Sequence, residues 1–223
     1  MTTQDPVHSL TLQFAPLADP IRAASMRAYQ RDQFDFLGIP APPRRAAVKA
    51  WAPSLPWPAL LALAGRLWDA PQREYQYAAI DLLDLRRREL PVEAIGPLLA
   101  LARRKPWWET VDGLAGVIGK LVRTHREAGA QEAMDAALHD DSFWIRRIAM
   151  THQLGWRLET DEARLFGYAL HLAPEREFFI RKAIGWALRD YAKWAPQAVG
   201  GFVAAHRERL SPLTLREATK HLA

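Results

Sequence analysis

Hydrophobic residues recur along this chain in steps of three and four, the spacing that places them on one face of an α-helix. No sustained alternation of apolar and polar residues, which would indicate β-strands, interrupts the pattern. Prolines, glycines and short polar clusters divide it into about a dozen segments of helical length. The pattern therefore predicts an all-α chain.

The breaks also predict where individual helices begin and end. We expect helices over residues 21–39, from near Arg44, over 59–68, over 73–88, from Pro91 to about Arg104, and from Pro106. Gly38 would end the first of these, because glycine readily adopts the backbone conformation that closes a helix. Pro106 would occupy the first helical position, where its missing N–H is not needed.

A weak internal repeat relates residues 35 positions apart. One column contains Asp112, Arg147 and Lys182. Two more contain Glu74, Glu109, Trp144 and Phe179, and Ala79, Leu114, Ala149 and Ile184. A period near 35 made of two helices is typical of an α-solenoid of HEAT or related type, in which equivalent positions face the same way. We therefore expect one curved, HEAT-like solenoid domain over residues 1–223, with a basic concave face.

Composition excludes several classes of site. The chain has no cysteine, which rules out disulfides, thiolate metal ligands and a cysteine nucleophile. Its seven histidines form no His-Glu-x-x-His or similar close pair, so we expect neither a metal nor a cofactor. The first five residues lack the basic and apolar character of a signal peptide, and no apolar run approaches the roughly 20 residues that span a bilayer. We expect a cytoplasmic protein with no membrane partner.

Basic residues exceed acidic ones, 30 to 25, which is consistent with a polyanionic partner. Six of them lie on successive repeat helices: Arg146, Arg147, Arg181, Lys182, Arg189 and Lys193. Such a row suits a phosphate backbone. Alternatively, these side chains cover a solvent-exposed face and pair with nearby acids, namely Glu175, Glu177 and Asp190.

Trp108 and Asp112 are four residues apart, so they lie on one face of the helix that follows Pro106. Together a π surface and a carboxylate attract a cationic group. The alternative is that Trp107 and Trp108 are core residues at a helix start and Asp112 is a solvated acid.

The remaining tryptophans are interpreted mainly as packing residues. Trp186 shares a helix face with Lys182 and follows Gly185, a pair that also fits close helix packing. Five others lie near helix ends and are assigned to packing: Trp51, Trp57, Trp68, Trp156 and Trp194.

Several segments in order resemble the AlkD-type DNA alkylation repair glycosylases, which are HEAT-like repeat proteins. The matching segments are residues 31–39, 67–69, 73–76, 107–112, 144–147, 177–193, 216–218 and 220–221. The longest, Glu177 to Lys193 with Gly185-Trp186 at its centre, is the most specific.

The resemblance implies a catalytic carboxylate at Asp112, with Trp108 and Trp186 lining the lesion site. It implies that Arg147 holds the DNA backbone beside the lesion and that Tyr29 lies near the same cleft. It also implies excision of cationic N3- and N7-alkylated purines without flipping of the base.

A single carboxylate suits that chemistry. Ordinary glycosidases use two carboxylates, one of which protonates the leaving group. An alkylated purine already carries a positive charge and leaves as a neutral base. We therefore expect a monomeric DNA glycosylase acting on double-stranded DNA, with DNA contacts from Arg147, Tyr29, Arg146, Arg181, Lys182 and Arg189. The alternatives are a non-catalytic helical-repeat DNA-binding protein and a family member with a different lesion range.

Overall fold

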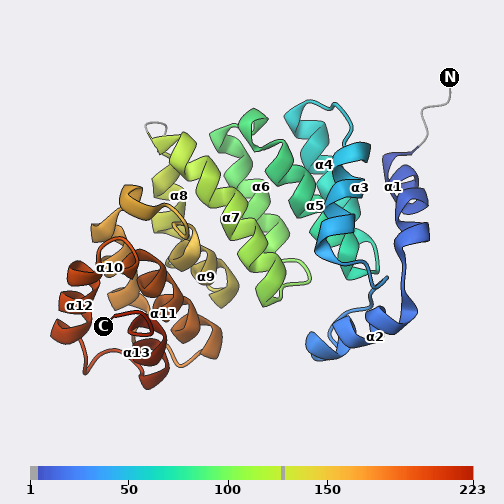
Figure 1. Ribbon diagram of the computed structural model, residues 1–223. Coiled ribbons are helices and arrows are strands. Elements are labelled where there is room, and N and C mark those ends of the chain that lie inside the picture. The colour runs from blue at the N-terminus through green and yellow to red at the C-terminus, as the bar shows by residue number, and fades with distance from the viewer. Residues whose placement is uncertain (1–4, 127–128, 223) are drawn as a thin grey trace. The chain divides into compact units, whose positions relative to one another are not determined.

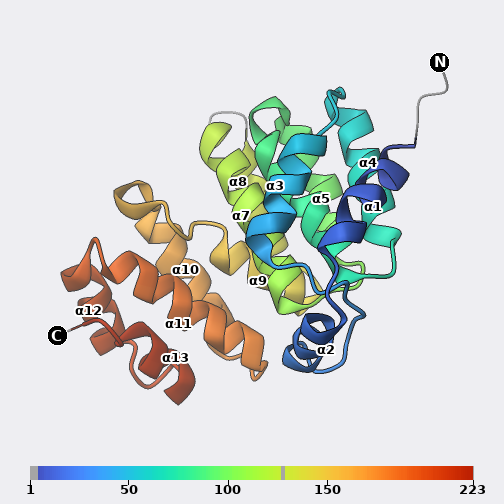
Figure 2. The same cartoon turned by 45° about the vertical axis from the view of Figure 1, so that its right-hand side comes forward.

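The structure, a computed structural model, describes residues 5–126 and 129–222 (Figures 1 and 2). Over these residues the chain forms thirteen α-helices joined by short turns, and its only β-type pairing is an isolated bridge between Asp35 and Gln72. The all-α prediction is confirmed. None of the helices described here has both the length and the apolar character that a membrane crossing requires. The chain divides into two compact units, Met1–Pro97 and Leu98–Ala223.

The first unit contains α1 (Pro6–Phe14), α2 (Pro20–Tyr29), α3 (Ala41–Trp51), α4 (Trp57–Asp69) and α5 (Arg73–Leu85). Helices α3 and α4 both pack on α5, and α1 packs on α3 and α4. Leu60 and Leu67 of α4 and Ala79 and Leu82 of α5 are fully buried. Helix α6 (Ile95–Ala102) contains the boundary between the units.

The predicted helix over residues 21–39 is wrong beyond Tyr29, where α2 ends. Arg31 and Asp32 both adopt left-handed backbone conformations, with φ of 56° and 57°. Gly38, at φ +83°, approaches the backbone of Asp19 so closely that a Cβ would lie 2.0 Å from its carbonyl oxygen. Gly38 thus lies in a turn that packs against the start of α2, and it does not end a long helix.

A buried carboxylate explains why this segment leaves the helical path. Glu74 of α5 is fully buried and accepts backbone hydrogen bonds from Leu37, Gly38 and Ile39 (2.9, 2.8 and 3.1 Å). These three N–H groups are therefore unavailable for a helix, and each buried donor has a charged partner.

Other helix bounds differ by a few residues from the predicted ones. Helix α3 begins at Ala41 and not near Arg44, because Pro42 and Pro43 fit the first helical turn. Helix α7 begins at Trp108, with Trp107 as the preceding cap residue, so Pro106 lies outside the helix.

The second unit contains α7 (Trp108–Thr124), α8 (Ala130–Ala137), α9 (Phe143–Thr151), α10 (Glu162–Leu172), α11 (Phe178–Ala192), α12 (Pro196–Ala205) and α13 (Pro212–Ala218). Helix α9 packs on both α7 and α11, while α8, α10 and α12 each pack beside their sequence neighbours. Figure 2 shows α13 lying along α11, a contact that is the most extensive in this unit. Successive helix pairs stacked in this way are those of the predicted helical-repeat fold.

The small apolar repeat column is a core feature. Leu114, Ala149 and Ile184 stand at equivalent places on α7, α9 and α11, and all three are buried. Gly185 brings α11 close to α13, because a Cβ there would lie 2.5 Å from Cβ of Glu217. The interpretation of Gly185 as a packing residue is confirmed.

Candidate active site

Asp112 and Arg147 form a two-point ion pair between α7 and α9. Nε of Arg147 donates to Oδ1 of Asp112 (2.8 Å) and Nη2 donates to Oδ2 (2.9 Å). The arginine side chain is 3% exposed and the aspartate side chain 17% exposed. Parallel hydrogen bonds of this kind fix the plane of a carboxylate as well as its position. Asp112 is thus held in one orientation with one edge open to solvent.

The same arginine connects this pair to α11. Its Nη1 donates to the carbonyl oxygen of Phe179 (2.5 Å). Its guanidinium carbon lies 5.9 Å from the ring centre of Trp186 and 6.0 Å from that of Phe179, within the range of cation–π attraction. Arg147 therefore brings Asp112 of α7 and Trp186 of α11 into one cluster. The repeat spacing predicted that Asp112 and Arg147 face the same way, and their side chains do meet.

Trp108 stands one turn before Asp112 on α7 and is half-buried. Its neighbour Trp107 packs its ring against Trp144 (6.0 Å between centres) and Phe179 (5.6 Å). Trp107 is thus part of an aromatic packing cluster, which agrees with the packing interpretation for that residue. The role of Trp108 stays a prediction.

Chemically, the cluster offers a carboxylate of fixed orientation and, on the other side of its contact with Arg147, the indole ring of Trp186 within cation–π range of that arginine. Each carboxylate oxygen has two lone-pair directions, and Arg147 uses one on each oxygen. The remaining directions can hold a water molecule or face a positive charge. Because Arg147 carries a compensating charge, the orientation of Asp112 matters here as much as its charge.

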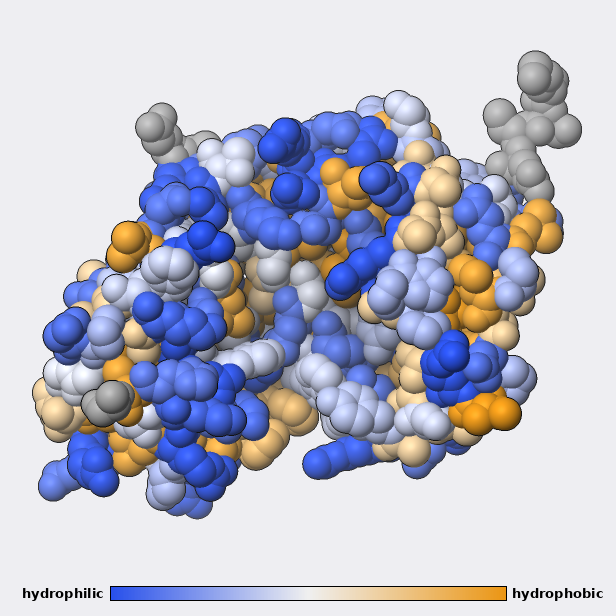
Figure 3. Space-filling view, in the orientation of Figure 1, coloured by the Kyte–Doolittle hydropathy of each residue, from blue (hydrophilic) through white to orange (hydrophobic). Residues whose placement is uncertain are grey.

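Three of the other predicted DNA contacts are paired with acids of the second unit, and a fourth, Arg181, is bound to a backbone oxygen. Arg146 binds both carboxylate oxygens of Glu175 (2.7 and 2.9 Å), and Nε of Arg181 donates to the backbone oxygen of Glu175. Lys182 and Arg189 both bind Glu217 (3.2 and 2.6 Å). Lys182 keeps 41% of its side chain exposed, so it can still meet a phosphate. Hydrophilic side chains predominate over α11–α13 on the face that Figure 3 shows.

Glu217 is a residue that the sequence analysis missed. It stands 35 positions after Lys182, so extending the charged column by one step would have found it. Burial alone would raise the pKa of Glu217, but the hydrogen bond from Lys182 and the charges of Lys182 and Arg189 outweigh it and lower that pKa. Glu217 is therefore an anion that holds two cations against α13.

Tyr29 belongs to the first unit. It ends α2, is 73% exposed, and lines a cavity of about 210 Å³ together with Met26, Phe36 and Tyr77. Its predicted place beside the lesion stays a prediction. Among the described residues, no group of three or more histidine, aspartate or glutamate side chains is arranged to hold a metal ion.

Comparison with known proteins gives this geometry a family. A family model for DNA alkylation repair enzymes matches residues 10–222. The chain belongs to this family. A solved structure from Enterococcus faecalis, described as a predicted DNA alkylation repair enzyme, shares 34% identity with a TM-score of 0.86 over 92% of this chain and 97% of that one.

Two more solved structures share the fold of this DNA alkylation repair enzyme at lower identity. One is smu.31 from Streptococcus mutans UA159, with 14% identity and a TM-score of 0.64 over 91% of this chain and 98% of that one. The other is AlkD2 from Streptococcus mutans, with 17% identity and a TM-score of 0.65 over 88% and 99%. No curated protein sequence matches the chain. The likeness to AlkD2 agrees with the fold that the AlkD-type resemblance implied.

Proposed function

We propose that this DNA alkylation repair enzyme is a DNA glycosylase that excises cationic N3- and N7-alkylated purines, such as 3-methyladenine and 7-methylguanine, and so initiates base excision repair. The observation that carries the proposal is the fixed orientation of Asp112 by Arg147 beside Trp186. A catalytic group that is already oriented pays little reorganisation cost during the reaction.

In the proposed reaction the bond between the purine nitrogen and C1′ of the deoxyribose breaks, and its electron pair moves to the base. The base leaves uncharged, and positive charge develops on the sugar. Water then forms the new bond to C1′ and loses a proton. Asp112 stabilises the charged sugar and holds the attacking water, which requires no second carboxylate.

Trp108 and Trp186 supply electron-rich ring faces to the same charged sugar. Trp186 has direct support, since its ring already lies 5.9 Å from the guanidinium carbon of Arg147 and thus beside the Asp112 cluster. Trp108 is supported by its place one turn before Asp112 on α7.

Binding of double-stranded DNA by a monomer is assigned to Arg146, Arg147, Arg181, Lys182, Arg189 and Tyr29. Lys182 is the basic residue best suited to a phosphate, because it is half-exposed and held by one acid that it shares with Arg189. Arg147 acts mainly by orienting Asp112, since almost none of its side chain reaches solvent.

Release of free base tests the proposal directly. Excess enzyme is mixed with DNA that carries 7-methylguanine, and the released base is quantified over time. The proposal expects a single-exponential release well above the spontaneous rate. A chain that binds the DNA but releases base only at the spontaneous rate would instead be the non-catalytic DNA-binding protein.

The proposed mechanism leaves the base in the DNA stack. A base that is flipped out must enter an enclosed pocket that contacts its edges. A 2-aminopurine placed beside the lesion becomes more fluorescent when its neighbour leaves the stack. We expect no such increase when the enzyme binds, and a clear increase would refute the non-flipping mode while leaving the glycosylase proposal intact.

A further inference from the structure

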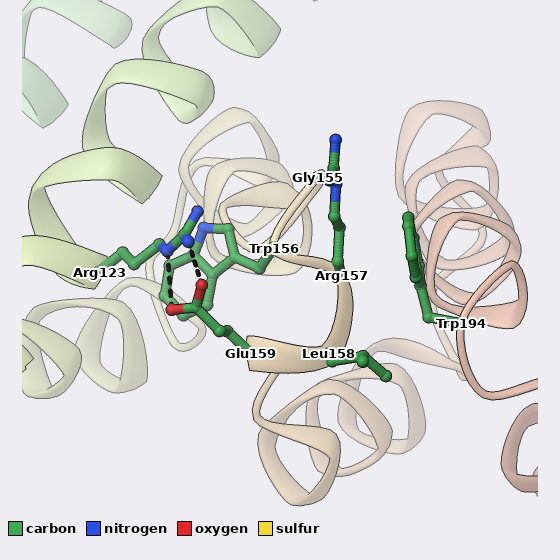
Figure 4. A pocket seen from close by; sticks show the side chains of 7 residues that line it. All are labelled: Arg123, Gly155, Trp156, Arg157, Leu158, Glu159 and Trp194. Carbon is green, nitrogen blue, oxygen red and sulfur yellow. Dashed lines mark hydrogen bonds and ion pairs between the residues drawn. The ribbon is translucent and has the colours of Figure 1, made fainter.

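A cavity of about 490 Å³ lies in the second unit, and none of the residues of the Asp112 cluster lines it (Figure 4). Its walls include Arg123, Trp156, Arg157, Leu158, Glu159 and Trp194. Arg123 lies in the last turn of α7, residues 155–159 lie between α9 and α10, and Trp194 lies just after the end of α11. The volume is within the range of small-ligand sites.

Arg157 has an unusual backbone and an uncompensated charge. Its φ of 60° is left-handed, a conformation that costs free energy for any residue with a side chain and that concentrates at binding sites. Among the described residues, no hydrogen bond or ion pair holds its guanidinium group. The guanidinium group makes a cation–π contact with Trp194, whose ring centre lies 5.2 Å from the guanidinium carbon.

Trp194 and Leu158 give the cavity an exposed apolar wall. Trp194, which the sequence analysis assigned to packing, is 42% exposed, and Leu158 is 74% exposed. Figure 4 shows Arg157 and Trp194 facing each other across the cavity. By contrast, Trp156 is buried beneath the guanidinium group of Arg126 (4.9 Å) and is a true packing residue.

The net charge around the cavity is positive. Glu159 is held by Arg123 through two hydrogen bonds and lies 3.7 Å from Arg126. The acid is thus neutralised by these two arginines, and Arg157 adds a third positive charge. The cavity therefore favours a ligand that combines an anionic group with a flat ring, and a nucleotide has both.

We propose that this cavity binds an unpaired nucleotide of single-stranded DNA, with its base stacked on Trp194 and its phosphate bound to Arg157. The nucleotide must be unpaired, since a base inside a duplex has both faces covered by its neighbours. The proposal does not depend on any catalytic role of Asp112.

The test measures binding of a fluorescein-labelled oligothymidylate of about eight nucleotides to the full chain by fluorescence anisotropy. Trp194→Ala should weaken binding roughly tenfold, the usual effect of removing a stacking platform. Trp194→Phe keeps a ring and should bind within about threefold of the original chain. Arg157→Gly removes one phosphate contact, so it should weaken binding and reduce the slope of log affinity against log salt by about 0.7. Glycine is chosen because it adopts the left-handed backbone of this position without strain.

Arg207→Ala is the matched control, because it removes one exposed arginine that does not line the cavity. The thermal unfolding midpoint of each variant is measured alongside. The proposal is overturned if Trp194→Ala and Arg157→Gly bind the oligonucleotide as tightly as Arg207→Ala does. It is equally overturned if a glutamate-rich peptide of the same charge displaces the oligonucleotide as well as unlabelled oligothymidylate does, because the cavity would then recognise charge alone. Neither readout involves an alkylated base, so the result is separate from the glycosylase proposal.

Discussion

Arg147 holds Asp112 by two parallel hydrogen bonds across a separation of 35 residues, and it donates a further hydrogen bond to the backbone of Phe179. One side chain thus joins α7, α9 and α11 at the point where the carboxylate is open to solvent. This relationship makes Arg147 a positioning residue for Asp112.

Replacing Arg147 with lysine keeps the positive charge but removes the fork that fixes the carboxylate. We expect Arg147→Lys to slow single-turnover base release by roughly tenfold to a hundredfold, because misplacing a catalytic group by about 1 Å has an effect of that size. Arg164→Lys alters an equivalent two-point pair, with Asp135, outside the proposed site and is the matched control. Equal rates for Arg147→Lys and the original chain would mean that the orientation of Asp112 is unimportant.

The close contact of α11 with α13 depends on Gly185. A Cβ at this position would lie 2.5 Å from Cβ of Glu217 and 2.9 Å from the backbone oxygen of Thr214. We expect Gly185→Ala to lower the free energy of unfolding by about 1–3 kcal/mol, as overpacking does. Gly167 of α10 has no atom within 4 Å of the same position, so Gly167→Ala should be neutral or stabilising by up to about 1 kcal/mol. Urea unfolding measures both, and an unaltered Gly185→Ala would contradict the packing account.

The free energy of unfolding should decrease as the pH falls from about 6.5 to about 4, because His152 has a lower pKa in the folded chain than in the unfolded chain. Burial is the main cause that lowers the pKa of this histidine from 6.5 to about 4, and its Nδ1 donates to the carbonyl oxygen of Ala149 (2.6 Å). Below pH 6.5 His152 becomes protonated in the unfolded chain, whereas in the folded chain it stays neutral until about pH 4. The folded state should therefore lose up to about 3 kcal/mol between these two values.

His152→Asn separates this effect from that of other groups. Asparagine keeps a donor near Ala149 but does not titrate, so the free energy of unfolding of this variant should vary less between pH 6.5 and 4. If the free energy of unfolding varies with pH in the same way for both proteins, His152 has the same pKa in the folded and unfolded chains, which would contradict this prediction.

The fold and the site differ in how far the sequence predicts them. Helical spacing identified the all-α class, and the period of 35 brought Asp112 and Arg147 together, because both are local or repetitive features. The path of residues 30–39 was missed, since it depends on Glu74, a buried carboxylate 35 or more positions away. The exposure of Trp194 was missed for a similar reason, because it depends on which elements surround the end of α11.

The pairing of the basic row was also left open by the sequence. Glu175 was foreseen as a partner for these cations, and it binds Arg146. Glu217 was not foreseen, although it binds both Lys182 and Arg189. Composition gives the number of charges, whereas their pairing depends on the packing of α13 against α11.

Lys182 distinguishes a DNA-binding role from a purely structural one. If it contacts a phosphate, Lys182→Ala should weaken duplex binding for all sequences and reduce the slope of log affinity against log salt by about one. The slope is obtained from anisotropy titrations at several salt concentrations. A slope that stays the same would mean that Lys182 serves only its ion pair with Glu217.

The central claim is that Asp112 stabilises the positive charge that develops on the deoxyribose as the base leaves. Asp135 provides a matched control, since Arg164 binds both its oxygens with the same two-point geometry (3.1 and 3.2 Å) outside the proposed site. The decisive measurement is the single-turnover release of 7-methylguanine from duplex DNA by Asp112→Asn and by Asp135→Asn. The account predicts a rate about a hundred to a thousand times lower for Asp112→Asn and an unaltered rate for Asp135→Asn. Release by Asp112→Asn at the rate of the original chain would contradict it.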